Sequence, residues 1–336
     1  MTILHICAGW EKWNGAANIA RMIMDEQRRE GHEVSFTTWA KVRELRAADE
    51  VWIHCGWLPC LWWAALVCCL TQRRKGAECA ERMLKWMPGA CYDPVRLRYH
   101  GWKKWLVGPI ERWCLRRCDS IVATCEAEKE WIEKYLGKKC PEIEVMDVKR
   151  FFELSRVGVL TQRRRDAECA EDEGKLSSAD VGLHLLYLGR RHPLKGVEYL
   201  EEAVMQLNSN PVNPVNPVQN SSARSTCPTY PKNSAPPASP RLCVKIISNA
   251  FGEELEKVWE WCDVLVLPTL SDNFGLVIAE ALERGKRVIT TDGAPAWGDS
   301  NDYGGRLVYL KGYRNGSPGE RVHLLKDAIE RLSCQS

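Results

Sequence analysis

Short apolar segments alternate with longer amphipathic segments along this 336-residue chain. The alternation runs through the first half and starts again in the second half. The predicted strands of the first half are residues 3–7, 32–37, 51–54 and 121–124, and its predicted helices are residues 16–29 and 126–136. In the second half the predicted strands are residues 183–188, 244–247, 264–267 and 287–290, with a helix at 197–207. This order is typical of parallel sheets covered by helices on both faces. The chain is also too long for one ordinary domain. We therefore predict an α/β protein with Rossmann-like domains at residues 1–172 and 173–336.

Two kinds of segment interrupt the alternation. Residues 70–81 return at 160–171 with changes at two positions only. Two copies so far apart are not a solenoid repeat, so we interpret both as surface insertions rather than as a duplicated binding element. Residues 208–240 hold eight of the seventeen prolines together with many Ser and Asn residues. Such a composition buries too little apolar surface to fold, which predicts a disordered insertion.

Bulk properties exclude several classes of protein. The net charge of +3 indicates no particular partner. The start of the chain lacks the basic region of a signal peptide, and the longest apolar run, residues 58–70, is shorter than a membrane span, so it reads as a buried helix. These features predict a cytoplasmic protein. None of the sixteen cysteines forms C-x-x-C, and we expect most of them to be core residues rather than metal ligands.

Three segments of the second half each follow a predicted strand. The first contains Gly189, Arg190, Lys195 and Gly196 just before a helix. Ligands of open α/β sheets bind at the carboxyl ends of strands, where helix N-termini favour anions. The two cations add formal charge, so a diphosphate is the expected ligand. An ordinary solvated turn could have the same residues, so this segment alone does not distinguish a diphosphate site from such a turn.

The second segment, residues 268–282, contains Asp272 in its loop and Glu280 near the start of the following helix. Gly275 between them allows a ligand to approach the backbone closely. Glu280 lies between two alanines, where a carboxylate without a hydrogen-bonding partner is costly to bury, and ribose hydroxyls would supply that partner. The third segment, residues 290–298, follows the next strand and is expected to face the same crevice.

Together these segments resemble the donor half of retaining glycosyltransferases with the GT-B fold, in the large family four. The signature of that family is an acidic residue, seven further residues and then Glu, running through Phe-Gly. Here it runs from Asp272 to Glu280, with Asp where the family usually has Glu. The resemblance implies that Glu280 holds the ribose and Asp272 the donor sugar. It also implies that backbone groups bind the sugar and phosphates at Asn273, Phe274, Gly275 and Leu276.

Gly189-Arg190 and Lys195-Gly196 match the Gly-Arg…Lys-Gly element of the same family, whose cations hold the nucleotide diphosphate. The implied fold is two Rossmann-like domains that face each other across a cleft. The implied activity moves a sugar from a nucleotide-sugar donor to a glycan or lipid-linked acceptor, with retention of anomeric configuration. Cell-surface polysaccharide or lipopolysaccharide synthesis is the expected pathway.

The first half resembles the family less. Gly15 lies where the family has a Gly-Gly turn after its first strand, and His54 resembles a histidine at a strand end, with a catalytic or acceptor-side role. A histidine at a strand end is also commonly structural. Residues 87–94 and 123–126 look like acceptor-domain loops of bacterial cell-surface polysaccharide glycosyltransferases.

Two fixed cations can replace a divalent metal and no D-x-D occurs, so we expect metal independence and no cofactor. The alternatives are a degenerate subunit that binds a sugar nucleotide without catalysis and a nucleotide-sugar epimerase on the same fold. A dinucleotide dehydrogenase is disfavoured because G-x-G-x-x-G is absent.

Residues 96–117 combine seven basic residues with one tyrosine and three tryptophans. This pattern predicts a helix with a solvated basic face and an aromatic face in the core. The alternative is a peripheral contact with anionic lipid at the inner face of the cell membrane. No nucleic-acid motif accompanies the basic residues, so nucleic acid is not an expected partner.

Overall fold

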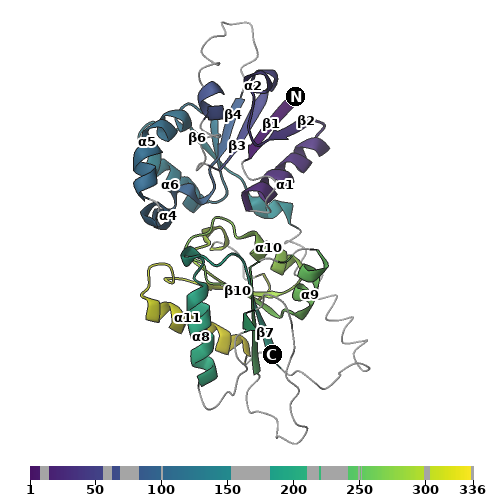
Figure 1. Cartoon of the computed structure of the whole chain (residues 1–336), viewed down its shortest axis with the longest axis vertical. Coiled ribbons are helices and arrows are strands. Elements are labelled where there is room, and N and C mark those ends of the chain that lie inside the picture. The colour runs from purple at the N-terminus through teal and green to yellow at the C-terminus, as the bar shows by residue number, and fades with distance from the viewer. Residues whose placement is uncertain are drawn as a thin grey trace, which may run out of the picture. The chain divides into compact units, whose positions relative to one another are not determined.

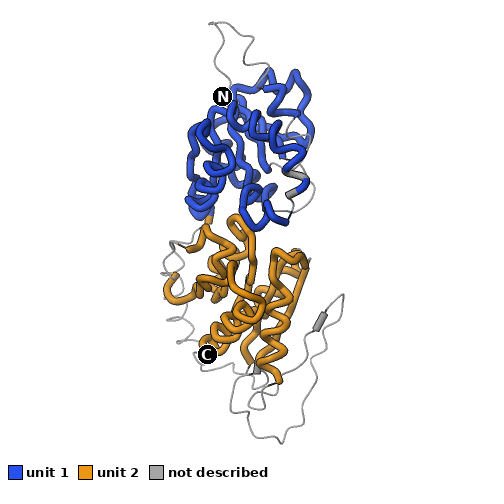
Figure 2. Tube along the Cα trace, turned by 90° about the vertical axis from the view of Figure 1, so that its left-hand side faces the viewer, with its two compact units in different colours: residues 1–151 blue, residues 152–336 orange. Residues whose placement is uncertain are grey.

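The chain forms two compact units, unit 1 at residues 1–151 and unit 2 at residues 152–336 (Figure 2). The predicted join between residues 172 and 173 and both copies of the duplicated segment lie outside the described residues. The computed structural model describes residues 1–7, 15–55, 63–68, 83–99, 101–152, 182–209, 219–220, 241–248, 250, 252–298 and 303–333.

Unit 1 contains a parallel sheet with the strand order β2-β1-β3-β4-β5-β6 (Figure 1). Its strands are β1 (Thr2–Cys7), β2 (Glu33–Thr37), β3 (Glu50–His54), β4 (Met83–Met87), β5 (Ser120–Ala123) and β6 (Glu142–Val145). Its helices are α1 (Gly15–Arg29), α2 (Val42–Ala47), α4 (Pro94–Tyr99), α5 (Gly101–Leu115) and α6 (Glu126–Leu136). Every residue of β3 and β5 is buried, as expected for central strands of a sheet covered on both faces.

Unit 2 contains a second parallel sheet with the order β12-β11-β10-β7-β9-β8. Its strands are β7 (Gly182–Leu188), β8 (Gln219–Asn220), β9 (Arg241–Ile247), β10 (Val264–Leu267), β11 (Arg287–Thr291) and β12 (Leu307–Leu310). Its helices are α8 (Val197–Ser209), α9 (Glu253–Trp261), α10 (Leu276–Glu283) and α11 (Pro318–Ser333). Two parallel sheets with crossover helices confirm the predicted α/β fold with two Rossmann-like units.

All eight predicted strands form, and the predicted bounds of α6 and β10 agree residue for residue. The proline-rich range 208–240 is described at only two places. Residues 208–209 end α8, and residues 219–220 form β8, which pairs with β9. Helix α8 therefore extends two residues into the predicted insertion, because the helical pattern of Leu200, Val204 and Leu207 continues to its last turn.

Of the apolar run 58–70, residues 63–68 are described and helical, with Ala64, Ala65 and Cys68 fully buried. The predicted helix is confirmed for these residues, and it is buried except at Trp63, whose side chain is exposed, and Leu66, which is partly buried. Across the described ranges, no helix combines the length and the apolarity needed to cross a membrane.

The predicted orientation of the aromatic helix is wrong. In α5 the side chains of Trp102 and Trp105 are exposed, whereas Glu111, Cys114 and Leu115 are fully buried. The carboxylate of Glu111 accepts a hydrogen bond of 2.9 Å from the hydroxyl of Tyr135 in α6. A buried carboxylate with a partner can occupy the inner face of a helix, and here it takes the place that the aromatic residues were expected to fill.

Candidate functional site

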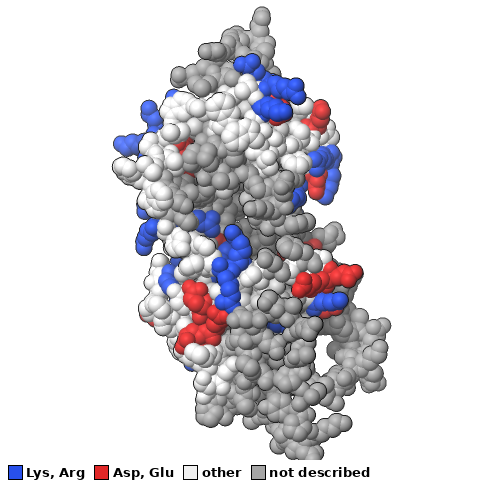
Figure 3. Space-filling view, in the orientation of Figure 1, with Lys and Arg blue, Asp and Glu red and all other residues white. Residues whose placement is uncertain are grey.

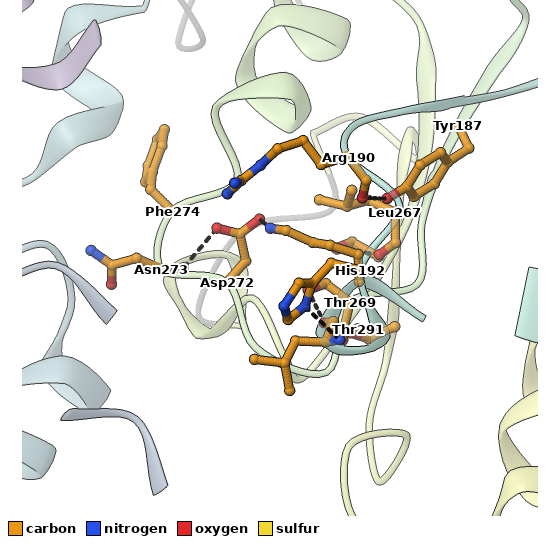
Figure 4. A network of polar contacts seen from close by, with 12 residues as sticks. Tyr187, Arg190, His192, Leu267, Thr269, Asp272, Asn273, Phe274 and Thr291 are labelled. Carbon is orange, nitrogen blue, oxygen red and sulfur yellow. Dashed lines mark hydrogen bonds and ion pairs between the residues drawn. The ribbon is translucent and has the colours of Figure 1, made fainter. Parts of the chain in front are cut away.

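The candidate site lies in unit 2, where the order of strands reverses. The chain passes from β7 to β9 on one side of β7 and then returns to β10 on its other side. In open parallel sheets, ligands bind outside the carboxyl ends of the strands at such a reversal. The segments that follow β7, β10 and β11 contain every site residue predicted in the second half. Figure 4 shows Arg190, Asp272 and Asn273 among them. The structure therefore brings the three segments to one edge of the sheet.

The loop after β7 is held by hydrogen bonds between side chains and backbone groups close to one another in the chain. The hydroxyl of Tyr187 donates a hydrogen bond of 2.9 Å to the carbonyl of Arg190. The backbone N–H of Leu194 donates to Nδ1 of His192 at 3.2 Å. Gly196 then adopts a left-handed conformation with φ of 62° before α8 begins. These contacts fix the backbone positions from which the side chains of Arg190 and Lys195 extend.

The loop after β10 packs directly on this first loop. The carbonyl of Leu194 accepts hydrogen bonds from the Thr269 hydroxyl at 3.0 Å and from the N–H of Leu270 at 2.9 Å. A Cβ on Gly196 would lie 2.1 Å from the carbonyl oxygen of Pro268, closer than any side chain permits. Glycine at position 196 is therefore required by the contact between the loops as well as by its backbone angle.

The loop after β11 joins the other two in the same way. The hydroxyl of Thr291 donates to the carbonyl of Thr269, and the N–H of Asp272 donates to the carbonyl of Gly293 at 2.7 Å. A Cβ on Gly293 would approach the carbonyl of Thr269 to 2.1 Å. The three loops therefore form one rigid rim, in which Asp272 has a fixed position.

Lys195 and Asp272 form an ion pair between the first two loops. Both side chains are about four-fifths buried, and the second oxygen of Asp272 accepts a hydrogen bond of 2.9 Å from the N–H of Asn273. Arg190 is exposed and forms no ion pair with another described residue. Its side chain extends to the side of the rim on which Asp272 lies (Figure 4). The rim thus presents two cations beside one carboxylate.

Phe274 and Gly275 have structural roles in this site. The ring of Phe274 is buried and packs against Phe152 and Trp297, while its carbonyl accepts a hydrogen bond from the Trp297 indole. Gly275 is left-handed, with φ of 64°, and precedes Leu276, the first residue of α10. The Phe274 side chain is therefore part of the core.

Glu280 is half-buried in α10 and no described residue forms a hydrogen bond to its carboxylate. Burial raises the pKa of this carboxyl above its ordinary value. Glu283 and Glu256 add to the rise and Arg284 opposes it. A carboxylate in this setting gains stability from any donor that reaches it, because burial without a hydrogen bond is unfavourable. Glu280 is thus suited to accept hydrogen bonds from neighbouring hydroxyls of a ligand.

In unit 1, His54 ends β3 and lies beside Cys7 of β1, at the carboxyl edge of the sheet. Its side chain is only 1% exposed. Nε2 of His54 lies 2.9 Å from Nδ1 of His5, and Nε2 of His5 lies 2.7 Å from the amide oxygen of Gln27 in α1. Because the Gln27 oxygen only accepts, this chain of contacts makes Nε2 the protonated nitrogen in both rings.

Both histidines are neutral at pH 7. Burial lowers the pKa of His5 from 6.5 to about 4, against the opposing effect of Gln27, and Arg28 lowers it further. Burial and then His5 lower the pKa of His54 well below its ordinary value. Both nitrogens of His5 are used in these contacts. The uncharged ring at the carboxyl edge of unit 1 is therefore that of His54, whose Nδ1 takes no part in them.

A pH-dependent loss of stability is expected from His5. Between pH 6.5 and pH 4 the unfolded chain binds a proton that folded His5 does not, so stability is complete above pH 6.5 and falls as the pH falls. The expected loss from pH 7 to pH 5 is about 2 kcal/mol. Urea unfolding at both pH values measures it, and His5→Gln should lose correspondingly less stability over the same interval. An equal loss in parent and variant would show that His5 does not titrate in this way.

The other predicted residues of unit 1 also lie at the carboxyl edge of its sheet. Gly15 begins α1, and residues 87–94 follow β4 as a buried turn around Tyr92. The Thr124 backbone and hydroxyl both donate to one oxygen of Glu128 at 2.7 Å after β5. The structure thus gathers the residues predicted for the acceptor side on one edge, as it gathers those of unit 2.

Sequence reasoning missed the residues that fasten the rim. Thr269, Thr291 and His192 each bind a backbone group of a loop, and Trp297 binds the carbonyl of Phe274. Their only signal in the sequence is a position just after an apolar strand. That signal marks them as loop residues but does not identify the loop that each one contacts.

The family model described as glycosyl transferases group 1 matches residues 182–311. This range begins with β7 and ends just after β12, so it contains the whole rim and Glu280. No curated protein sequence matches the chain.

Solved structures resemble both units. Sucrose-phosphate synthase from Thermosynechococcus elongatus has a TM-score of 0.60 and 13% identity, over 99% of this chain and 89% of that one. Anabaena HepE in complex with UDP has a TM-score of 0.57 and 14% identity, over 98% and 90%. The α,α-trehalose 6-phosphate synthase of Burkholderia multivorans has a TM-score of 0.54 and 12% identity, over 98% and 88%. At this identity the likeness shows the fold alone. The chain has the GT-B fold, and the part that holds its candidate site matches glycosyl transferases group 1, which supports glycosyl transfer.

Proposed function

We propose that this chain transfers a sugar from a nucleotide-sugar donor to a glycan or lipid-linked acceptor, with retention of anomeric configuration. One observation carries the proposal. The rim places Arg190, Lys195 and Asp272 together at the strand reversal of unit 2, and Glu280 follows in α10. Two cations suit a diphosphate, and carboxylates suit the hydroxyls of ribose and sugar. A nucleotide sugar contains all of these groups in one molecule.

In the proposed reaction, the bond between the anomeric carbon and the diphosphate oxygen breaks and its electron pair goes to the diphosphate. Arg190 and Lys195 stabilise the negative charge that develops there, so we propose that no metal ion or other cofactor is needed. A diphosphate would compete with Asp272 for the Lys195 ammonium and leave that carboxylate available to the sugar. The acceptor hydroxyl attacks on the face that the diphosphate leaves, and the departing phosphate takes its proton.

We assign the acceptor to the carboxyl edge of the sheet in unit 1, around His54, Gly15 and residues 87–94. The neutral imidazole of His54, whose Nδ1 is not used in its contact with His5, can hydrogen-bond to a sugar hydroxyl without carrying a charge. The pathway proposed is cell-surface polysaccharide or lipopolysaccharide synthesis in the cytoplasm, at the inner face of the membrane. The alternatives, a binding subunit without catalysis and an epimerase, have no observation of their own in their favour.

The test is a calorimetric screen of nucleoside diphosphates and nucleotide sugars, beginning with UDP because the HepE structure holds UDP. A donor that binds is then incubated with candidate acceptors, and the anomeric configuration of the product is read by NMR. Binding followed by a product of retained configuration supports the proposal. Binding without transfer to any acceptor would favour a degenerate subunit, and conversion of the free nucleotide sugar would favour an epimerase.

A further inference from the structure

Helix α5 carries an exposed apolar face, which we call the outer face of α5 and define by Trp102, Trp105, Leu106 and Ile110. Their side chains are 69%, 79%, 59% and 54% exposed. Trp105, Leu106 and Ile110 follow Trp102 by three, four and eight residues, and this spacing puts all four on one side of the helix. Tyr99 at the end of α4 is also half exposed, directly before this helix in the chain. Contiguous apolar surface of this kind marks an interaction site more often than a scattered residue does.

The opposite side of α5 shows that this orientation is fixed by packing. Gly108, Glu111, Cys114 and Leu115 are buried. A Cβ on Gly108 would lie 3.1 Å from the Tyr135 hydroxyl, the same group that donates to Glu111. Rotating the helix to bury its tryptophans would expose this contact and force larger side chains against α6. The outer face therefore remains turned away from the core of unit 1.

Basic residues flank the outer face of α5 along the chain. Residues 94–118 contain seven basic residues and a single acidic one, Glu111, which is buried. Arg98 is exposed, and the Arg117 guanidinium lies 3.9 Å from the ring centre of Trp113. Figure 3 shows blue side chains beside uncoloured surface on the side of unit 1 where Figure 1 places α4 and α5. Among the charged side chains of this segment that the structure describes, only basic ones are accessible.

We propose that the outer face of α5 docks unit 1 on a membrane surface that contains anionic lipid. Tryptophan favours the boundary between lipid headgroups and acyl chains, while Leu106 and Ile110 are suited to the apolar side of that boundary. Basic residues around them are attracted by anionic headgroups. A second copy of the chain fits less well, because two such faces would bring like charges together. A nucleic acid would satisfy the arginines but would leave Leu106 and Ile110 exposed.

The docking surface lies in unit 1 and the donor site in unit 2, so each can be tested without the other. The full chain is sedimented with vesicles of phosphatidylcholine alone and with vesicles that also contain phosphatidylglycerol. Binding is expected only with the anionic lipid, and should weaken as the ionic strength rises from about 0.1 M to about 1 M. Trp105→Gln and Ile110→Gln should each weaken binding about tenfold, since each removes one inserted apolar side chain.

Trp39→Gln is the matched control, because Trp39 is a tryptophan of unit 1 that is 59% exposed and lies outside this helix. It should bind vesicles as the parent does. All three variants should have the melting temperature of the parent and bind nucleoside diphosphate as tightly as the parent.

Absence of vesicle binding by the parent overturns the proposal, as does equal binding to vesicles with and without anionic lipid. Vesicle binding by Trp105→Gln and by Ile110→Gln that equals binding by the parent overturns it too. A DNA oligonucleotide that binds the parent and all variants alike would identify an electrostatic partner instead. Vesicle binding by a chain that binds no nucleoside diphosphate would support the membrane contact and count against the proposed function alone.

Discussion

Replacing Lys195 or Arg190 by alanine is expected to lower kcat/KM by about 30- to 1000-fold, which is about 2–4 kcal/mol of transition-state stabilisation. Both cations would face the departing diphosphate, where negative charge increases as the bond breaks. The double variant should lose less than the sum of the two single losses, because both residues act on the same group. Steady-state kinetics with saturating acceptor measure all three values.

The control is Arg191→Ala. Arg191 lies in the same loop, but its guanidinium pairs with Glu201 of α8 at 2.6 Å. Its loss should leave kcat/KM close to that of the parent. A purely structural role for Lys195 gives a different pattern. In that case Lys195→Ala lowers the melting temperature, and the double variant that also contains Asp272→Ala restores it. The value of kcat/KM per folded molecule is then the same in all of these variants and the parent.

Much of the fold could be predicted from the sequence because buried parallel strands have an unambiguous pattern. The run Val264–Leu267 is apolar at every position, and the structure buries all four residues. By contrast, β6 is an edge strand with mostly exposed side chains, Glu142 and Glu144 among them, and nothing in its composition distinguishes it from a loop. β6 therefore lacks the continuous apolar run that identifies a strand buried on both faces.

The site could be predicted as three separate loops but not as one rim. Lys195 and Asp272 are 77 residues apart in sequence, and contacts between their two loops, such as that of Leu194 with Thr269, bring them together. The orientation of α5 was predicted wrongly for a related reason. Periodicity identified its aromatic stripe, but a buried hydrogen bond between Glu111 and Tyr135 decides which side faces the core. Contacts between distant segments leave no periodic signal in either segment.

The central claim is that unit 2 holds the nucleotide of a sugar donor, with Glu280 on its ribose. Calorimetric titration of Glu280→Ala with the nucleoside diphosphate that binds the parent tests this claim most directly. Glu283→Ala is the matched control, because Glu283 is an exposed glutamate one turn further along α10. Asp272→Ala distinguishes binding of the nucleotide from binding of the sugar, because the proposed partner of Asp272 is the sugar, which a nucleoside diphosphate lacks.

Glu280→Ala is expected to weaken nucleoside diphosphate binding by about 10- to 100-fold, because hydrogen bonds to a charged group contribute about 1.5–3 kcal/mol. Its melting temperature at pH 7 should not fall, because burial already disfavours the ionised carboxylate. Glu283→Ala and Asp272→Ala should bind the nucleoside diphosphate as the parent does, and Asp272→Ala should lose turnover. A folded Glu280→Ala chain that binds nucleoside diphosphate as tightly as the parent would contradict the proposed donor site.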